Sequence, residues 1–397
     1  MNGNEVAIVT EANAALPLTG LFVVELGANI AAPYAGHVLA DLGAEVLKIE
    51  RPGGGDDARS WGPPFIDGMA PPFQAVNRNK QSAAVDLKDA RQRAALRRLI
   101  IERADVVLQN MRPGVVEDCG LDAKSLRVEK PSLIYCNLSA YGAQGPLREK
   151  SGYDPLMQAC GGIMSVTGHP DQEPVRVGPS IVDEAAGMWA VIGILAALNR
   201  RHLTGAGCEV DTSLFETAVG WCGLHIATYL VSKKVPRPLG TENIGSVPSK
   251  AYRASDGWIV IAAGNDKLWR QFAHALGHPE WLDDPGFRTN PDRVRNRERC
   301  NRLIAEIIAT DARSAWHAKL EAAGVPSAPL LTIDEVIAHP QTKAVGMVQQ
   351  APGGHPPLVG VPLQFDGVRP PLRTLPPALG AHTDRVLGEM AEAKVGT

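Results

Sequence analysis

The residue best suited to do chemistry in this chain is a carboxylate at the start of a long apolar segment. Asp183 and Glu184 precede the uncharged run Ala185–Leu198. Aspartate is a favoured N-cap residue, so Asp183 is expected either to cap a helix or to be a reactive group held at its amino end. An ionised aspartate can attack an activated acyl group as a covalent nucleophile. We expect the helix dipole to keep this carboxylate charged and weakly basic, so its reactivity depends on positioning in a partly dry site.

Other motifs give weaker signals. The loop Gly27–Ala32 follows a predicted strand but lacks the glycines of a dinucleotide-binding turn, so a structural β-α-β unit is favoured over a nicotinamide site. The glycine-rich segment Arg51–Asp56 has no Lys-Ser/Thr and is no phosphate loop; it either borders a ligand crevice or is a surface turn. His274 and His278 lie four apart, but Gly277 should end their helix, so no metal site is expected. No G-x-S-x-G nucleophile elbow occurs.

Composition excludes several classes of protein. The 397 residues are 45% hydrophobic and 21% charged, which is typical of a globular chain. A net charge of -3 argues against a nucleic-acid or membrane-surface binder. The six cysteines are scattered without C-x-x-C spacing, which indicates reduced thiols and a cytoplasmic location. We expect no membrane span, because Ala185–Leu198 is the longest apolar run and suits a core helix better.

The order of apolar segments predicts an α/β fold. Leu21–Leu26 and Ala44–Ile49 are typical of buried strands, and Pro33 fits the first turn of the helix between them. Strands joined by a helix imply a parallel sheet, so we expect a Rossmann-like, doubly wound large domain plus a smaller α/β domain. Further strands are expected at 104–108, 133–138, 207–211 and 258–262, and helices at 89–103, 212–231, 267–276, 292–308 and 314–323.

Proline and glycine mark the expected domain boundaries. Residues 1–225 should form the N-terminal part of the large domain and 226–249 a linker, because three prolines and two glycines between Val235 and Ser249 break the pattern. Residues 250–330 should form the small α/β domain. Residues 331–397 should be a second linker and a return to the large domain.

A set of short motifs recurs in order along the chain. It includes Pro17–Gly20, Asp41–Ala44, Val46–Pro52, Asn77–Lys80, Asp86–Lys88, Arg112–Gly114, Gly152–Asp154, Gly264–Asp266 and His382–Asp384. Together these motifs resemble the class III CoA-transferases, a family that includes formyl-CoA transferase, carnitine CoA-transferase and the α-methylacyl-CoA racemases. Each fragment is weak alone, but the ordered set covers the chain from Pro17 to Leu387.

The resemblance implies a function for Asp183, which lies where the family has its nucleophilic aspartate. It implies that Asp183 attacks an acyl-CoA to give a mixed anhydride, that CoA then forms an aspartyl-CoA thioester, and that an acceptor carboxylate reverses the sequence. Coenzyme A and acyl-CoA are then substrates, and no permanently bound cofactor or metal is expected. The site has to exclude water, because hydrolysis would discharge either intermediate.

Tyr153 and Asp154 bear on the choice between transferase and racemase. Racemases of the family have a histidine base where this chain has Tyr153, and tyrosine, with a pKa near 10, is a poor base at neutral pH. The transferase is therefore favoured, with Asp154 as a capping or salt-bridged residue beside the site. The racemase remains an alternative, as does a catalytically silent acyl-CoA-binding protein.

The resemblance also places the substrate contacts. Arg51 and Lys88 are expected to meet the CoA phosphates, unless Arg51 pairs with Asp56 and Lys88 is merely solvated. Further CoA contacts are expected at Asn29, Ile30, Ala31, Ala32, Leu87 and Asn110. Trp61, Tyr141 and Tyr153 are expected to shape the acyl or acid pocket, with ordinary packing as the alternative for Trp61 and Tyr141.

Some family features are missing or changed. There is no tetraglycine loop, Ile30 replaces a glutamine, and Asp118 replaces a CoA-contacting arginine. The formyl-CoA and oxalate pair is therefore not carried over to this chain. The family folds as an interlocked homodimer, in which each subunit is a ring threaded through the other, and we expect the same here.

Overall fold

The computed structural model describes residues 16–385, which divide into two compact units. The first unit contains residues up to Ile163, Arg176–Lys233 and the segment from Pro340 onward. The second contains Met164–Val175 and Lys234–His339. Each unit is described separately below.

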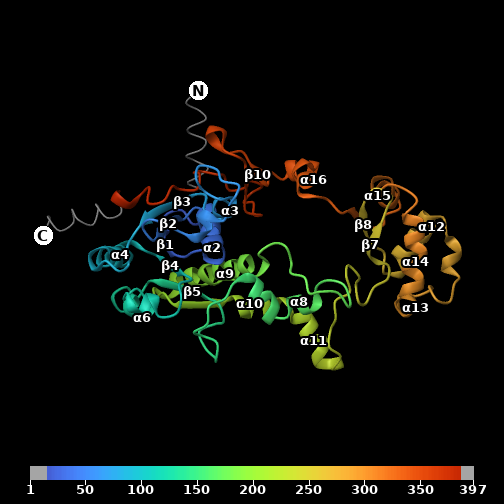
Figure 1. The fold of residues 1–397 in the computed structure, drawn as a ribbon, viewed down its shortest axis with the longest axis horizontal. Coiled ribbons are helices and arrows are strands. Elements are labelled where there is room, and N and C mark those ends of the chain that lie inside the picture. Colours follow the sequence, from blue (N-terminus) through green and yellow to red (C-terminus); the bar gives the residue numbers. More distant parts are fainter. Residues whose placement is uncertain (1–15, 386–397) are drawn as a thin grey trace. The chain divides into compact units, whose positions relative to one another are not determined.

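The first unit is built on a six-stranded parallel sheet with strand order β3-β2-β1-β4-β5-β6 (Figure 1). This order reverses between β1 and β4, and in such sheets ligands bind at that point, beyond the carboxyl ends of the strands. The strands are β1 (Phe22–Leu26), β2 (Glu45–Glu50), β3 (Lys80–Ala84), β4 (Val106–Gln109), β5 (Ile134–Ser139) and β6 (Glu209–Ser213).

Helices cover both faces of this sheet, as its sequence pattern predicts. Alternate residues of β1 serve different cores: Val23 packs with α2 and α9, while Val24 packs with α4 and α6. The covering helices are α2 (Ala31–Asp41), α4 (Ala90–Arg103), α5 (Val115–Asp118), α6 (Ala123–Glu129) and α9 (Ile181–Thr204). The smaller elements are η1 (Asp57–Ser60), α3 (Pro71–Ala75), α7 (Asp154–Cys160), α8 (Ile163–Val166), α10 (Leu214–Trp221), α11 (Gly223–Ser232), α17 (Pro340–Ala344), β10 (Val348–Gln349), η3 (Pro352–Gly354) and β11 (Leu358–Val359).

Helices α2 and α9 pack closely. A Cβ atom on Gly187 would lie 2.7 Å from the carbonyl oxygen of Ala31 and 3.0 Å from the Tyr34 ring. Only glycine therefore permits the observed approach of the first turn of α2 to α9.

Helix α9 is long and apolar enough to cross a membrane by length and composition, although its longest uncharged run, Ala185–Leu198, predicts no membrane span. In the first unit it packs against α2 and strands β5 and β6 through Ala186, Ala190, Ile194 and neighbouring residues. Core helices of soluble proteins pass the same test, and this packing is of that kind. Its other side exposes Met188, Trp189 and further apolar side chains.

The second unit combines a small antiparallel sheet with helices around an aromatic core. Its strands are β7 (Ser249–Arg253), β8 (Trp258–Ala262) and β9 (Ser327–Pro329), in the order β7-β8-β9. Its helices are α12 (Asp266–Leu276), η2 (Pro279–Leu282), α13 (Asn290–Arg295), α14 (Arg297–Ile308), α15 (Arg313–Ala322) and α16 (Ile333–Ala338). Trp269 stacks on Trp281 with 5.8 Å between the ring centroids.

The unit boundaries differ from the expected ones. The segment expected as a linker from residue 226 begins inside α11. The second unit extends to His339 because Arg313 of α15 pairs with Glu335 of α16 at 2.8 Å. It also takes in Met164–Val175, where the amide of Gly240 donates to the carbonyl of Gly168 at 2.7 Å.

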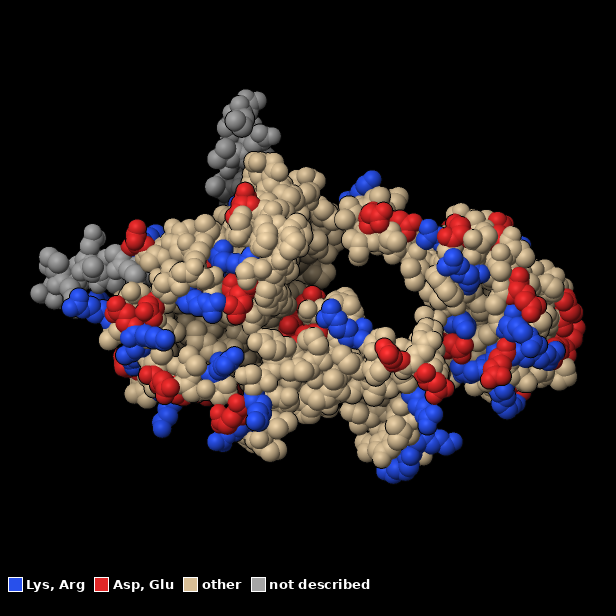
Figure 2. All heavy atoms as spheres, in the orientation of Figure 1, with Lys and Arg blue, Asp and Glu red and all other residues tan. Residues whose placement is uncertain are grey.

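Two expected helices are broken. The segment 212–231 forms α10 and α11, which are bent by 59° around Cys222, beside two glycines. The segment 292–308 forms α13 and α14, because Asn296 between them has non-helical backbone angles. Figure 2 shows acidic and basic side chains interspersed over the visible face of each unit, consistent with the small net charge.

Candidate active site

A cavity of about 120 Å³ lies in the first unit where the strand order reverses. Its walls come from the loops that follow β1, β4 and β5 and from the first turn of α9. The residues lining it include Asn29, Ile30, Ala31, Asn110, Met111, Arg112, Ser139, Lys150, Tyr153 and Asp183.

Asp183 presents a free carboxylate to this cavity. Helix α9 begins at Ile181, and its N-cap is Ser180, so of the two alternatives for Asp183 the capping one is wrong. The side chain is partly buried, and within residues 16–385 its oxygens take no hydrogen bond or ion pair. Asp183 is therefore available to a ligand in the cavity.

Asp154 caps helix α9 in its place. Its Oδ2 accepts the amide of Val182 at 2.8 Å and that of Asp183 at 3.4 Å, and its Oδ1 accepts from Gln158 Nε2 at 2.6 Å. Only 3% of Asp154 is exposed. Of the two roles expected for Asp154, capping or a salt bridge, the structure shows capping.

The electrostatics of Asp183 differ from the prediction. Burial, together with the nearby carboxylates of Asp154 and Glu184, raises its pKa from 3.8 to about 7. The expected stabilisation of the anion by the helix does not prevail, because Asp154 already takes the amides that would supply it. A carboxylate with a pKa near 7 is a stronger nucleophile, when ionised, than an ordinary aspartate.

The loop after β1 has an unusual backbone conformation and is bound by a residue that follows the neighbouring strand β4. Asn29 has a left-handed backbone, with φ of 68°. The side chain of Asn110 accepts the amide of Ala28 and donates to its carbonyl, both at 2.9 Å. Asn110 therefore lines the cavity but uses its amide group to fix this loop. Helix α2 starts at Ala31 with no side-chain cap.

Of the other expected substrate contacts, only Tyr153 lines this cavity. Arg51 is exposed and pairs with Asp57 rather than with Asp56, and Lys88 is exposed. Leu87 packs at the edge of the core between the sheet and α4, and Ala32 is fully buried. Trp61 is exposed, whereas Tyr141 packs on Phe215 with ring centroids 5.9 Å apart. Tyr153 is 53% exposed and lines the cavity.

Two cations of the cavity were not predicted as site residues. Arg112 and Lys150 both line it. For Arg112 a signal existed in the sequence, because it stands just beyond the carboxyl end of the predicted strand before it, where open sheets bind ligands. Lys150 lies in a long loop with no such pattern. Within residues 16–385, no cluster of three or more histidine, cysteine or acidic side chains is arranged to hold a metal ion.

Comparisons with known proteins identify the class. The chain matches CoA-transferase family III over residues 18–383. It is 35% identical to succinyl-CoA:glutarate CoA-transferase of Mus musculus, over 96% of this chain and 88% of that protein. It is also 35% identical to succinate--glutarate CoA-transferase of Agrobacterium fabrum, over 95% of this chain and 96% of that protein. The chain therefore belongs to CoA-transferase family III and is a CoA-transferase.

A solved structure agrees with this assignment. A CAIB/BAIF family protein from Brucella suis superposes with a TM-score of 0.86 at 39% identity, covering 94% of this chain and 99% of that one. The mixed α/β fold with its six-stranded parallel sheet is thus shared with a solved relative.

Proposed function

We propose that this enzyme moves CoA from an acyl-CoA to a dicarboxylic acid through covalent intermediates on Asp183. The observation that carries the proposal is the unpaired, partly buried carboxylate of Asp183 in the cavity at the point where the sheet order reverses. The dicarboxylic class of acid is taken from the substrates in the names of both relatives.

The proposed reaction proceeds in four steps. An oxygen of Asp183 attacks the thioester carbonyl, the C–S bond breaks, and a mixed anhydride and CoA thiolate form. The thiolate attacks the aspartyl carbonyl, which gives an aspartyl-CoA thioester and releases the donor acid as its carboxylate. The acceptor carboxylate then attacks that thioester, giving a second anhydride and CoA thiolate. Attack of the thiolate on the acceptor carbonyl completes the new acyl-CoA and restores Asp183.

The uncapped start of α2 supports these steps. Ile30 and Ala31 line the same cavity, and the amino end of a helix favours negative charge nearby. Oxyanions develop at each carbonyl attack, and donors fixed beforehand at such a position lower the barrier. We propose that Arg51, Leu87 and Lys88 contact the body of CoA, and that Trp61 and Tyr141 shape the acid site.

The test of this function is chemical trapping. Wild-type protein mixed with an acyl-CoA should gain the mass of an adduct that hydroxylamine removes, and peptide mapping should locate it on Asp183. The racemase alternative predicts deuterium exchange at the α-carbon of the acyl group with no acceptor acid and no adduct. Acyl-CoA binding without adduct or exchange would support a silent binding protein instead.

The rate should depend on pH through Asp183. Its raised pKa, about 7, means that the carboxylate is mostly protonated and unreactive below neutral pH. We expect kcat/KM for the acyl-CoA to rise about tenfold per pH unit below 7 and to level off above it. Measurement across pH 5 to 9 with a buffer-independent assay checks this. If kcat/KM instead levels off above about pH 4, Asp183 titrates like an ordinary aspartate.

Arg112 should contribute to recognition of the acid. Arg112 lines the same cavity as Asp183, and a guanidinium suits a second carboxylate by charge and fork geometry. Arg112→Ala should raise KM for a dicarboxylic acceptor by about tenfold to a hundredfold, and for a monocarboxylic acid much less. Arg98→Ala, an exposed arginine paired with Glu102 on α4, is the matched control and should leave both KM values unchanged. Equal losses for both acids would contradict this role.

We propose a homodimer of the interlocked kind and a cytoplasmic location. The support for a dimer is the apolar side of α9 and α11, where Trp189, Ile192, Leu224 and Leu230 are exposed. Apolar surface of this extent favours association.

The dimer is tested on α9. Wild-type protein should elute with twice the chain mass of 42.3 kDa in size exclusion with light scattering. Trp189→Glu with Ile192→Glu should give mostly monomer, because it buries two unpaired charges in the interface. Val128→Glu, which changes an exposed side chain on α6, should not change the mass. A wild-type monomer would refute the proposal.

A further inference from the structure

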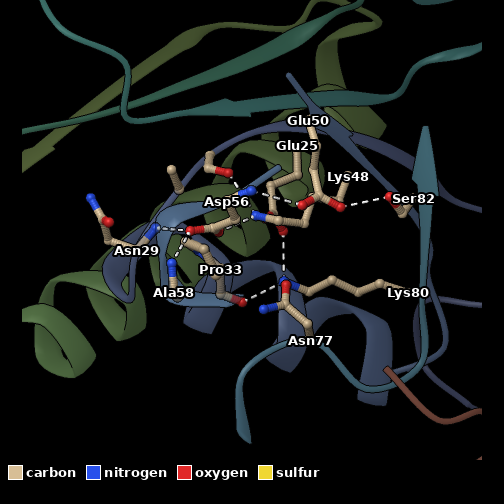
Figure 3. A network of polar contacts seen from close by, with 12 residues as sticks. Glu25, Asn29, Pro33, Lys48, Glu50, Asp56, Ala58, Asn77, Lys80 and Ser82 are labelled. Carbon is tan, nitrogen blue, oxygen red and sulfur yellow. Dashed lines mark hydrogen bonds and ion pairs between the residues drawn. The ribbon is translucent and has the colours of Figure 1, made fainter. Parts of the chain in front are cut away.

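A buried network of charged side chains joins strands β1, β2 and β3 below the loop that follows β1 (Figure 3). Glu25 of β1 accepts from Lys48 Nζ of β2 at 2.9 Å and from Lys80 Nζ of β3 at 2.8 Å. All three side chains are fully buried. Charges are rarely buried unless they are paired in this way.

The network reaches the backbone at the start of that loop, at its middle and in the first turn of α2. Lys48 Nζ donates to the carbonyl of Gly27 at 2.6 Å, and Lys80 Nζ donates to that of Pro33 at 2.7 Å. The amide of Asn29 donates to Asp56 Oδ1 at 2.9 Å. Figure 3 shows these contacts converging on one stretch of chain from three different elements.

Asp56 comes from the glycine-rich segment Arg51–Asp56. Gly53 and Gly54 are exposed, but Gly55 is buried and Asp56 is only 3% exposed. Its Oδ2 lies 2.8 Å from Lys48 Nζ, and its Oδ1 also accepts the amide of Ala58 at 3.0 Å. Its own amide donates to Glu50 Oε2 at 2.9 Å. The segment is therefore neither a phosphate loop nor a plain surface turn, since it delivers a buried acceptor.

The loop needs such an acceptor. Asn29 stands in the left-handed region, which side chains with a Cβ adopt at a cost, although asparagine tolerates it better than most. The hydrogen bond to Asp56 is the contact that stabilises the Asn29 amide in this orientation. A hydrogen bond to an ionised acceptor is stronger than one between neutral groups.

We propose that Asp56, held by Lys48, is a positioning residue for CoA transfer: it fixes the amide of Asn29 and thereby the cavity wall Asn29–Ala31 that Asp183 shares. Asp56 touches no reacting atom in this scheme. The inference rests on the proposed function of Asp183, and it assigns to the network a part in the rate of acylation as well as in folding.

Two substitutions at Asp56 separate its hydrogen bonds from its charge. Asp56→Ala and Asp56→Asn both remove the ion pair with Lys48, which keeps Glu25 as a partner. Only asparagine retains an oxygen that can accept the amides of Asn29 and Ala58. Asp284→Ala is the matched control, because Asp284 also accepts a backbone amide, that of Gly286 at 2.8 Å, and pairs with a cation in the second unit.

The first measurement is hydrogen exchange of peptides covering residues 27–33. We expect Asp56→Ala to speed exchange there by about a hundredfold relative to wild type, with peptides of β4 and β5 unchanged. Asp56→Asn should speed it by about tenfold. Unchanged exchange in folded Asp56→Ala overturns the proposal.

The second measurement is the single-turnover rate of the Asp183 adduct. We expect a loss of about a hundredfold in Asp56→Ala and of about tenfold in Asp56→Asn, since small displacements from the reactive geometry have effects of this size. Asp284→Ala should react at the wild-type rate per folded molecule. Equal losses in the two Asp56 variants, or a loss within about threefold of wild type in both, overturn the proposal.

The two readouts also separate this inference from the proposed function. If wild-type protein forms no adduct on Asp183, the covalent mechanism fails, and hydrogen exchange still decides whether Asp56 holds the loop. If wild type forms the adduct and the Asp56 variants match it, only the positioning role fails. Should Asp56→Ala not fold, Asp56→Asn carries both tests, and wild-type values for both readouts overturn the proposal.

Discussion

Replacing Asp183 with asparagine should abolish CoA transfer and make the protein more stable. The amide cannot attack a thioester, so kcat should fall by about 10⁴ or more. The carboxylate takes no hydrogen bond that asparagine would lose, and it is repelled by Asp154 and Glu184. Removing its charge therefore relieves the folded state.

The gain in stability should depend on pH. The pKa of Asp183 rises from 3.8 to about 7 on folding, so between these values the folded state binds more protons than the unfolded chain. Wild-type stability then falls as pH rises through this window, and the loss is complete above 7. The shift sets an upper limit of about 4 kcal/mol, and partial exposure reduces it to about 1–2 kcal/mol.

Urea denaturation at pH 5 and pH 8, with activity assayed on the same samples, checks both effects. The free energy of unfolding of Asp183→Asn should clearly exceed that of wild type at pH 8 and exceed it much less at pH 5. Glu102→Gln, an exposed change on α4, is the control and should show no such trend. Retained turnover in Asp183→Asn would falsify the mechanism, whereas a variant without added stability at pH 8 would contradict the crowding of charges.

Replacing Gly187 with alanine should damage both stability and catalysis. The new Cβ would lie 2.7 Å from the carbonyl oxygen of Ala31, which belongs to the backbone and cannot rotate away. Either α9 moves from α2, or the wall Asn29–Ala31 moves from Asp183. Overpacking of this kind costs about 1–3 kcal/mol, and displacement of the wall should lower kcat about a hundredfold.

The matched control lies on α10, a helix that also contacts α9. Gly220→Ala introduces the same methyl group on α10, where no atom lies within 4 Å of the new Cβ. Thermal unfolding and steady-state kinetics of the two variants give the comparison. Wild-type kinetics in Gly187→Ala would mean that the contact between α2 and α9 does not set the geometry of the site.

Much of the fold was predictable because the apolar runs of β1, β2, β4, β5 and β8 are short and bounded by turn residues. Strand β3 was missed because its sequence, K-Q-S-A-A, has no apolar run. Its Lys80 and Ser82 are buried as members of the charged network, so this edge strand of the sheet is held by buried polar residues. Periodicity cannot reveal a strand whose inner face is made of ion pairs.

The site was predictable in part, and for different reasons. The identity of Asp183 came from the family resemblance, since residue physics favoured a cap. Its environment was predicted wrongly, because the competitor for the helix amides, Asp154, is 29 positions away in sequence. Contact of Arg51 and Lys88 with the CoA phosphates remains a prediction. Both residues are exposed and neither lines the cavity.

The carboxylates of Asp154, Glu184 and Asp183 lie close together in the free enzyme. While Asp183 is ionised, these partly buried negative charges repel one another. Each acyl or CoA ester on Asp183 neutralises one of them. Under the proposed cycle, charge repulsion raises the free energy of the free enzyme, and this repulsion is absent from the acylated enzyme. The difference in free energy between the free enzyme and its covalent intermediates is therefore smaller.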